Sequence, residues 1–315
     1  MTDIKFIKLL FFLSLCYGYL NGSGLYGFSN DYYGYYDQPN ANFYNWRESS
    51  IILATLTVKK FHIGVYLISF FLAFSLGLML RTYFKIKKIK SFSFYLIIFV
   101  AILHTHPIIM SVSGAMRQGW AMIFIFLSLF FLLDEKKTLS LIMITIAVFM
   151  HKSGLFFFLV YILTIISLYI QKKFSQKKLL IILSSLIVAI SFFIFMGSSN
   201  NLITQRIIGA DLRPVWLVIN IMYIFYYIYS YNFFSSSKFN FASLFFLYVC
   251  ILLPITAYYG FTYNYERLNM IIAIPLILTS LSNIKKDSYY FALSAVMFLY
   301  LFLTIYLGMY SEGLV

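Results

Sequence analysis

The chain has 315 residues, of which 62% are hydrophobic, 21% are aromatic and only 11% are charged. Because an average globular protein is roughly 25% charged, this composition excludes a water-soluble globular fold. The formal net charge is +14. The lysines cluster in short segments between apolar runs rather than on one basic face, so we expect no nucleic-acid partner.

The N-terminal segment combines two lysines with an apolar run, as a signal peptide does. Lys5 and Lys8 come first, and no A-x-A-like cleavage site follows the run. The motif "LSLC" (13–16) is similar to a lipoprotein cleavage box, but Leu15 is too bulky for the position before Cys16. We therefore expect residues 4–20 to remain as an uncleaved signal-anchor helix.

The segment 21–60 is expected to be an extracytoplasmic loop with an amphipathic stretch. It contains the aromatic run "NDYYGYYDQPNANFYNW" (30–46). Two interpretations of tyrosines such as Tyr32 and Tyr35 stay open. Their rings can stack on the C–H faces of sugars and hold a glycan, or they can form an interfacial aromatic belt.

The remaining apolar runs are continuous rather than alternating, and several approach the ~20 residues that cross a ~30 Å hydrocarbon core as a helix. The sequence predicts an all-α polytopic integral membrane protein, with a single membrane domain over 1–315 and about 11 transmembrane helices. The expected spans are 4–20, 61–80, 91–110, 119–133, 138–150, 155–170, 179–196, 215–234, 239–259, 268–282 and 289–309.

The basic residues divide unevenly between the two sides of this topology. One side holds 16 of the 24, so we expect it to be cytoplasmic, with the N-terminus inside and the C-terminus outside. These residues are Lys5, Lys8, Arg81, Lys85, Lys87, Lys88, Lys90, Lys136, Lys137, Lys172, Lys173, Lys177, Lys178, Lys238, Lys285 and Lys286.

The opposite side is rich in arginine and histidine instead. It holds five of the six arginines, three of the eighteen lysines and all four histidines. Since the guanidinium group is a planar fork for phosphate or carboxylate, this pattern predicts an anionic ligand at the outer face. The alternative is that these arginines snorkel to lipid phosphates. The residues are Arg47, Lys59, Lys60, His62, His104, His106, Arg117, His151, Lys152, Arg206, Arg213 and Arg267.

Four stretches on the outer side resemble motifs of the EpsG-like, Wzy-type polysaccharide polymerases. "GFSNDYYGYYD" (27–37), followed by Glu48, resembles the loop after the family's first helix. "MRQGWA" (116–121) is similar to its R-Q-x-x-A element, and "AVFMHKSGLFFF" (147–158) to its A-x-x-F-H-x-S element. "YNYERLNMIIAIP" (263–275) looks like its late arginine before a returning helix.

The resemblance implies a GT-C-like membrane glycosyltransferase. Such an enzyme transfers a growing glycan from undecaprenyl pyrophosphate to the next lipid-linked repeat unit at the outer face of the bacterial cytoplasmic (inner) membrane. The implied partners are the undecaprenyl-pyrophosphate-linked oligosaccharide, membrane lipid and a chain-length regulator protein. No cofactor and no metal ion are expected; His104 and His106 alone have metal-ligand spacing, without further ligands nearby in sequence.

The implied chemistry assigns roles to the outer residues. Arg117 and Arg267 are expected to stabilise the charge of the leaving pyrophosphate. His151 is either a general base for the acceptor hydroxyl or a donor to the pyrophosphate, and Asp31 or Glu48 is the alternative base. Further substrate-binding residues are expected at Arg206, Arg213, Tyr32, Tyr35 and Glu266, the last as ion-pair partner of Arg267.

Three other functions compete with this one. A repeat-unit flippase would carry polar groups near the middle of many helices, whereas charges here are predicted to lie at one face. An O-acyltransferase would need a histidine reached from the cytoplasm. An O-antigen ligase shares the arginine and histidine chemistry but usually has a larger outer loop.

Overall fold

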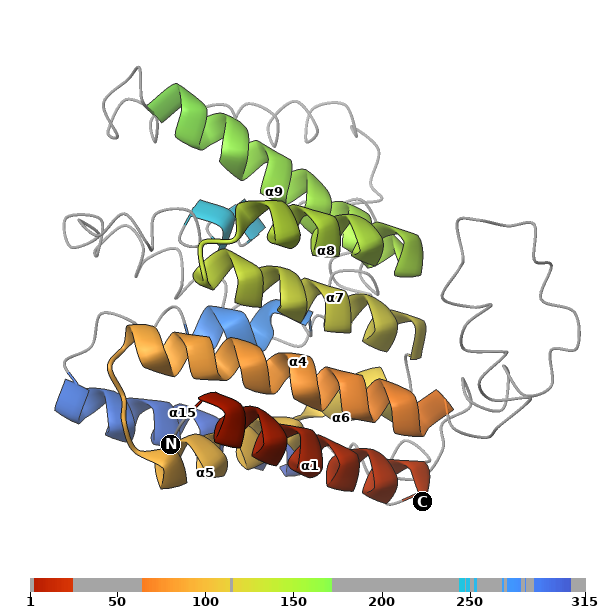
Figure 1. The fold of residues 1–315 in the computed structure, drawn as a ribbon, viewed down its shortest axis with the longest axis vertical. Helices are drawn as coiled ribbons and strands as arrows, with labels where there is room; N and C mark the ends of the chain where they lie inside the picture. The colour runs from red at the N-terminus through yellow and green to blue at the C-terminus, as the bar shows by residue number, and fades with distance from the viewer. Residues whose placement is uncertain are drawn as a thin grey trace, which may run out of the picture. The chain divides into compact units, whose positions relative to one another are not determined.

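A computed structural model gives the fold of the chain (Figure 1). It describes residues 3–24, 64–113, 116–171, 244–246, 248–249, 252–253, 268, 271–278, 281 and 286–306. All regular elements within these residues are helices. The chain forms two compact units, Met1–Phe156 with Ile284–Val315, and Phe157–Asn283.

The first unit is organised around a row of four neighbouring helices (Figure 1). They are α1 (Asp3–Gly22), α4 (Gly64–Ile86), α7 (Met116–Leu133) and α8 (Lys137–Met150). The same unit contains α5 (Phe92–Leu103), α6 (His106–Ser113) and α15 (Lys286–Tyr306), while α9 (Lys152–Gln171) begins in it. The prediction of helices over 4–20, 119–133 and 138–150 is confirmed to within three residues.

Two of the described helices, α4 and α7, are long and apolar enough to cross a membrane. Shorter apolar helices are α5, α8, Ser153–Tyr169 within α9 and Ser288–Leu299 within α15. Many large apolar side chains on these helices are exposed, including Ile97 and Phe291. The spans at 179–196 and 215–234 lie outside the described residues, and the count of eleven spans stays a prediction.

Close contacts at glycines show the relative orientation of neighbouring helices in this row. Gly18 of α1 packs on the backbone of Tyr66, and Gly77 of α4 packs on Leu10, so α1 and α4 are antiparallel. Gly119 of α7 packs against Ile68 near the start of α4, so α4 and α7 are parallel. A Cβ at Gly119 would lie 2.1 Å from the carbonyl oxygen of Ser111, which explains why α6 and α7 need a glycine there.

The register of α7 and α8 comes from a reciprocal pair of hydrogen bonds. The Ser128 hydroxyl donates to the Ser140 carbonyl at 2.9 Å, and the Ser140 hydroxyl donates to the Ser128 carbonyl at 2.8 Å. Both serines are buried. Since the helices run in opposite directions, a residue that precedes Ser128 by a given number of positions lies level with the residue that follows Ser140 by the same number.

The predicted single helix over 91–110 is wrong, because the chain breaks between α5 and α6 at His104 and Thr105. A helix that ends inside an apolar bundle leaves carbonyls without intrahelical partners. Here neighbours supply donors: His104 Nδ1 lies 2.8 Å from the Val100 oxygen, Thr105 donates to Ile102 at 2.7 Å, and Tyr17 donates to Leu103 at 2.8 Å.

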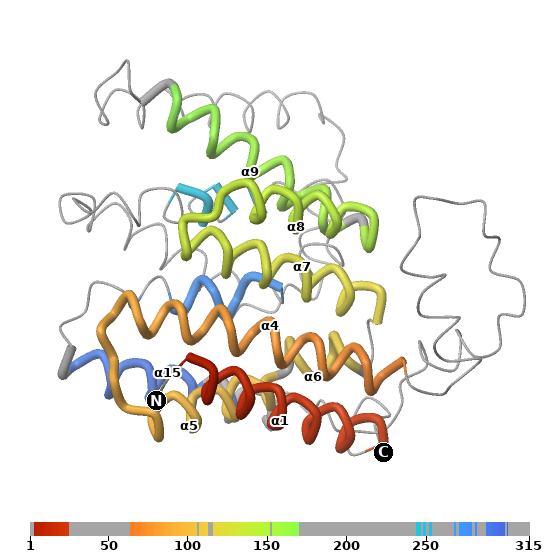
Figure 2. The backbone as a smooth tube through the Cα atoms, viewed as in Figure 1, coloured from red at the N-terminus to blue at the C-terminus, as the bar shows by residue number. Residues whose placement is uncertain are grey.

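The turns that follow α4 and α7 lie at the same end of the unit (Figure 2). Both are Schellman motifs, in which the residue after the helix adopts a left-handed conformation that glycine usually provides. Lys88 has φ 56° and Glu135 has φ 64°. The Ile89 N–H donates to the Phe84 carbonyl, and the Lys136 N–H donates to the Phe131 carbonyl.

The break between α5 and α6 leads to a prediction for two tyrosine-to-phenylalanine substitutions in α1. Tyr17→Phe removes the only O–H donor described at the Leu103 carbonyl and leaves this buried group unsatisfied, which typically costs about 1–3 kcal/mol. Tyr19→Phe is the control, because Tyr19 is 68% exposed on the same helix. In thermal unfolding of the purified protein, we expect a lower midpoint for Tyr17→Phe only; equal midpoints would contradict this role of Tyr17.

Candidate functional site

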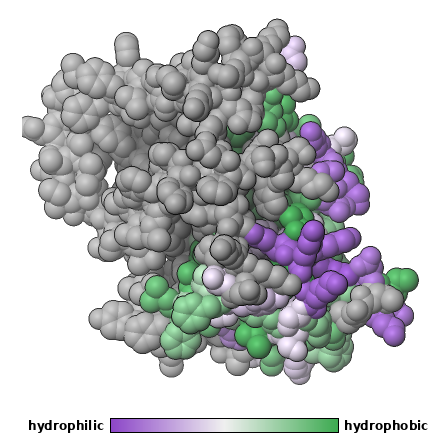
Figure 3. Space-filling model, turned by 90° about the vertical axis from the view of Figure 1, so that its left-hand side faces the viewer, coloured by the Kyte–Doolittle hydropathy of each residue, from purple (hydrophilic) through white to green (hydrophobic). Residues whose placement is uncertain are grey.

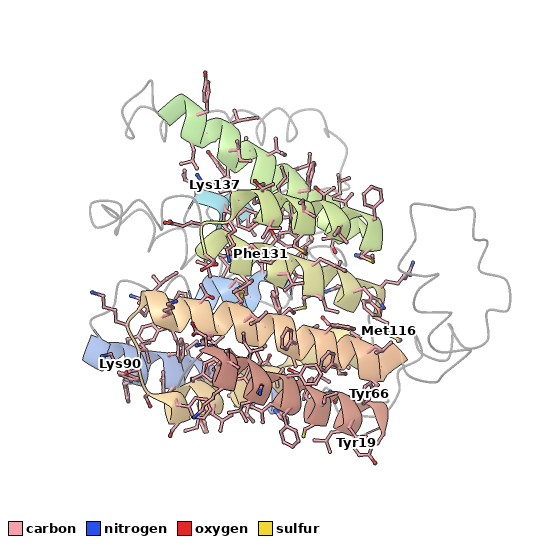
Figure 4. All side chains as sticks on the ribbon, in the orientation of Figure 1. Tyr19, Tyr66, Lys90, Met116, Phe131 and Lys137 are labelled. Atoms are coloured by element: carbon pink, nitrogen blue, oxygen red, sulfur yellow. The ribbon has the colours of Figure 1, made fainter. Side chains whose placement is uncertain are left out.

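The two ends of the first unit differ in their charged side chains. Lys5, Lys8, Arg81, the lysines of 85–90 and the pair Lys136 and Lys137 belong to the end where α1 and α8 begin and α4 and α7 finish. Figure 4 shows Lys90 and Lys137 toward this end, and Tyr19, Tyr66 and Met116 toward the opposite one. The first end is called the lysine-rich end below, and the second the Arg117 end.

Hydrophilic residues gather at the lysine-rich end beside hydrophobic surface (Figure 3). Arg81 is the single arginine expected there, and its contacts are intramolecular. Its guanidinium pairs with Asp3 and lies over the Phe6 ring, 3.8 Å from the centroid. Arg81 therefore ties the start of α1 to the last turns of α4, which is a structural role.

At the opposite end, Arg117 lies within the first turn of α7 rather than before it, because α7 begins at Met116. Its side chain is partly exposed. Residues 118–133 of α7 carry no charged side chain. The unpaired N–H groups of a helix start, together with the helix dipole, give this position a positive potential that favours an anion.

His151 lies between α8 and α9, where the chain reverses. The α7–α8 register puts it level with Arg117, since Arg117 precedes Ser128 by the same eleven residues by which His151 follows Ser140. Gly154 permits the reversal, because a Cβ there would meet the Ala147 carbonyl oxygen at 2.2 Å. The sequence elements R-Q-x-x-A and F-H-x-S thus place Arg117 and His151 at one end and one level of neighbouring helices.

The hydrogen bonds of His151 determine its tautomer. The Ser153 N–H donates to Nδ1 at 3.2 Å, and the Ser153 hydroxyl lies 2.8 Å from the same nitrogen. A nitrogen that accepts an N–H carries no proton, so the neutral ring carries its proton on Nε2. His151 is 9% exposed and acts as the N-cap of α9, because its side chain accepts from the second residue of that helix.

Ser153 is a residue that the sequence reasoning missed as a site member. It holds the His151 ring through both its backbone N–H and its hydroxyl. The signal was present in the H-x-S spacing, because a serine two residues after a histidine at a helix start can reach the ring nitrogen. Ser153 is buried, so it orients His151 rather than meeting solvent.

His104 is protonated on the other ring nitrogen. Its Nδ1 lies 2.8 Å from the Val100 carbonyl oxygen, which can only accept, so Nδ1 carries a proton. His104 is exposed, and its ring lies 6.3 Å from that of Tyr17, centroid to centroid. Among the residues that the structure describes, no group of three or more histidine, cysteine or acidic side chains could hold a metal ion.

The other predicted site residues lie outside the described residues. They are Asp31, Tyr32, Tyr35, Glu48, Arg206, Arg213, Glu266 and Arg267. The structure therefore puts Arg117 and His151 at one level of neighbouring helices, adds Ser153 as a contact of His151, and leaves these eight as predictions.

Comparison with known proteins adds no relative. No family model matches the chain, and no curated protein or solved structure is significantly similar to it.

The capping role of His151 leads to a stability prediction. His151→Ala removes the acceptor for the Ser153 N–H and should destabilise the protein by about 1 kcal/mol. His151→Asn should be nearly neutral, because asparagine is among the best N-cap residues. Thermal unfolding of the purified variants checks this order; an equal loss of stability in both would mean that capping is not the contribution of this side chain.

Proposed function

We propose that this protein is a Wzy-type polysaccharide polymerase, a membrane glycosyltransferase that links lipid-carried repeat units at the outer face of the cytoplasmic membrane. The observation that carries the proposal is the shared level of Arg117 and His151 at the end opposite the lysines. These residues belong to the two family-like motifs "MRQGWA" and "AVFMHKSGLFFF".

The placement in the membrane follows from the same polarity. Lysine-rich loops remain on the cytoplasmic side, which puts the Arg117 end outside, with a cytoplasmic N-terminus and multiple spans. Arg117 then lies at the depth of headgroup phosphates. An undecaprenyl pyrophosphate anchored in the same membrane would present its charge at this depth.

The proposed reaction concentrates negative charge on the leaving group. A hydroxyl of the acceptor repeat attacks the anomeric carbon, the bond from that carbon to the pyrophosphate oxygen breaks, and the hydroxyl proton goes to a base. Arg117 and the Nε2–H of His151 are donors suited to the departing pyrophosphate. No metal ion is needed for this stabilisation, because fixed guanidinium groups supply positive charge.

The tautomer of His151 favours the donor role over the base role, since Nδ1 already accepts from Ser153. The base is then Asp31 or Glu48, with Arg267, Arg206 and Arg213 as further contacts of the anionic substrate, Glu266 as partner of Arg267, and Tyr32 and Tyr35 at the glycan. A chain-length regulator protein is the proposed partner.

A deletion strain distinguishes this function from its rivals. Loss of a polymerase leaves single repeats exported on the lipid anchor or transferred to the cell surface, whereas loss of a flippase leaves no surface repeats. Loss of an O-antigen ligase leaves long chains on undecaprenyl pyrophosphate. We expect the first pattern when surface glycans of the deletion strain are separated by size; either of the other two patterns would replace the proposed function.

Arg117→Lys tests the pyrophosphate donor. Lysine keeps the charge but loses the planar fork, and loss of one such donor typically lowers the rate on the order of a hundredfold. Arg81→Lys is the matched control, because Arg81 lies at the lysine-rich end and pairs with Asp3. We expect short or absent polymer with Arg117→Lys at normal protein level, and long polymer with Arg81→Lys; the assignment fails if Arg117→Lys gives wild-type chain lengths.

The activity of His151→Asn distinguishes the helix-capping role of His151 from its proposed role in the reaction. Asparagine retains the cap of α9 but lacks the imidazole Nε2–H, so we expect a stable protein that accumulates unpolymerised lipid-linked repeats. Lys152→Ala, at the next position, should leave long chains, because water and ions readily replace a flexible ammonium group. Normal polymer from His151→Asn would reduce His151 to a structural cap.

A further inference from the structure

The two basic turns at the lysine-rich end differ in how their charge is compensated. In the α7–α8 turn, Lys136 pairs with Asp134 at 2.7 Å, and the four residues 134–137 have no net charge. In the α4–α5 turn, Lys85, Lys87, Lys88 and Lys90 lie within six residues, and residues 82–103 contain no acid. The α4–α5 turn therefore presents a concentrated positive charge that its own segment does not neutralise.

This charge lies next to a cluster of aromatic rings from three helices. Phe84 of α4 stacks on Phe94 of α5, with centroids 5.7 Å apart, and Phe94 meets Tyr290 of α15 edge to face at 4.6 Å. Aromatic rings at the end of apolar helices are typical of the boundary between acyl chains and headgroups. Lysines directly beyond such rings are at the level of lipid phosphates.

The lysines of the turn are not equivalent. The Lys87 ammonium lies 5.5 Å from the centroid of the Tyr289 ring, and burial lowers the pKa of Lys87. Lys85, Lys88 and Lys90 are exposed, and their ammonium groups can reach a ligand on the membrane surface. Lys87 therefore packs against the helices, while the other three carry the accessible charge.

The backbone at Lys88 offers a substitution that separates charge from folding. Lys88 ends a Schellman motif at φ 56°, as Glu135 does at φ 64° in the α7–α8 turn, and glycine avoids the steric cost that a Cβ introduces there. At Lys88 the side chain supplies a charge that glycine would lose.

From these observations we infer that the α4–α5 turn binds the headgroup of an anionic phospholipid, with Lys85, Lys88 and Lys90 contacting the phosphate above the aromatic cluster. This inference rests on the membrane placement proposed above and is independent of glycosyl transfer. The ligand is a membrane lipid rather than a soluble anion, because the aromatic cluster lies at the same turn and two of its rings, Phe94 and Tyr290, are partly exposed and can contact acyl chains.

The experiment compares two matched double variants of the full-length protein purified in an uncharged detergent. Phosphatidylglycerol, with phosphatidylcholine of the same acyl chains as reference, is titrated while the unfolding midpoint is followed. Each lysine near an anionic surface strengthens binding about fivefold, so Lys88→Gln/Lys90→Gln should weaken the apparent affinity on the order of 25-fold. Lys136→Gln/Lys137→Gln should retain it within about threefold, since Lys136 is already paired.

Lys88→Gly should change two measured quantities in opposite directions, which a variant that simply misfolds cannot do. Removal of the left-handed strain should raise the midpoint in phosphatidylcholine by about 2 °C, while the loss of charge should reduce the gain from phosphatidylglycerol. Both changes together support the inference. It is overturned if phosphatidylglycerol has no specific effect, if both double variants lose affinity equally, or if soluble glycerol phosphate protects as well as the lipid.

Discussion

The exclusion of charge from the middle of the helices is the constraint on which the rest of the structure depends. In the described helices of the first unit and in α9, lysine, arginine and acidic side chains occur only within the first or last two turns. Internal polar contacts are made by neutral groups, such as the paired Ser128 and Ser140. Because an uncompensated charge is costly in an apolar interior, every charged residue of these described helices must act at one end or the other.

This constraint gives the two ends separate chemistry. At the lysine-rich end, the positive charge is neutralised within the α7–α8 turn but not within the α4–α5 turn. Arg81 at this end joins α1 to α4. At the other end, Arg117 and His151 share a level, and Lys152 follows His151 directly in the chain. That separation suits the proposed function, in which a leaving group of high negative charge meets fixed donors on one side of the membrane only.

The break between α5 and α6 shows how the chain departs from a simple bundle. Three side chains, from Tyr17, His104 and Thr105, donate to the carbonyls that the break exposes. Two of them come from the break itself and one comes from α1. The cost of ending a helix inside an apolar environment is thereby offset locally, which makes the break compatible with a membrane protein.

Sequence reasoning predicted the helices around α4, α7, α8 and α9 because each is a long apolar run between charged turns. It missed the break at His104 because the residues on both sides are equally apolar; the available signal was Pro107, which is favoured in the first turn of a helix. It selected Arg117 and His151 as candidates from residue type and motif. Their common level depends on the Ser128–Ser140 register, which no pattern within a single helix encodes.

The tautomer of His151 was also beyond the sequence, since it depends on the backbone angle at the start of α9, whereas the H-x-S spacing could have indicated the contact of Ser153 with the ring. The sequence left a base and a donor as equal alternatives for His151. One hydrogen bond of 3.2 Å from the Ser153 N–H decides which nitrogen carries the proton. A local contact of this kind changes which proposed role His151 suits without changing the identity of any residue.

The central claim is that the Arg117 end handles a lipid pyrophosphate leaving group. The most direct test is to measure the release of undecaprenyl pyrophosphate by the purified protein from lipid-linked repeat units in the presence of a chelator. The account predicts one released carrier for each glycosidic bond formed. Polymer formation without release of the carrier, or no reaction in a preparation that retains its fold and its native lipid-linked substrate, would contradict it.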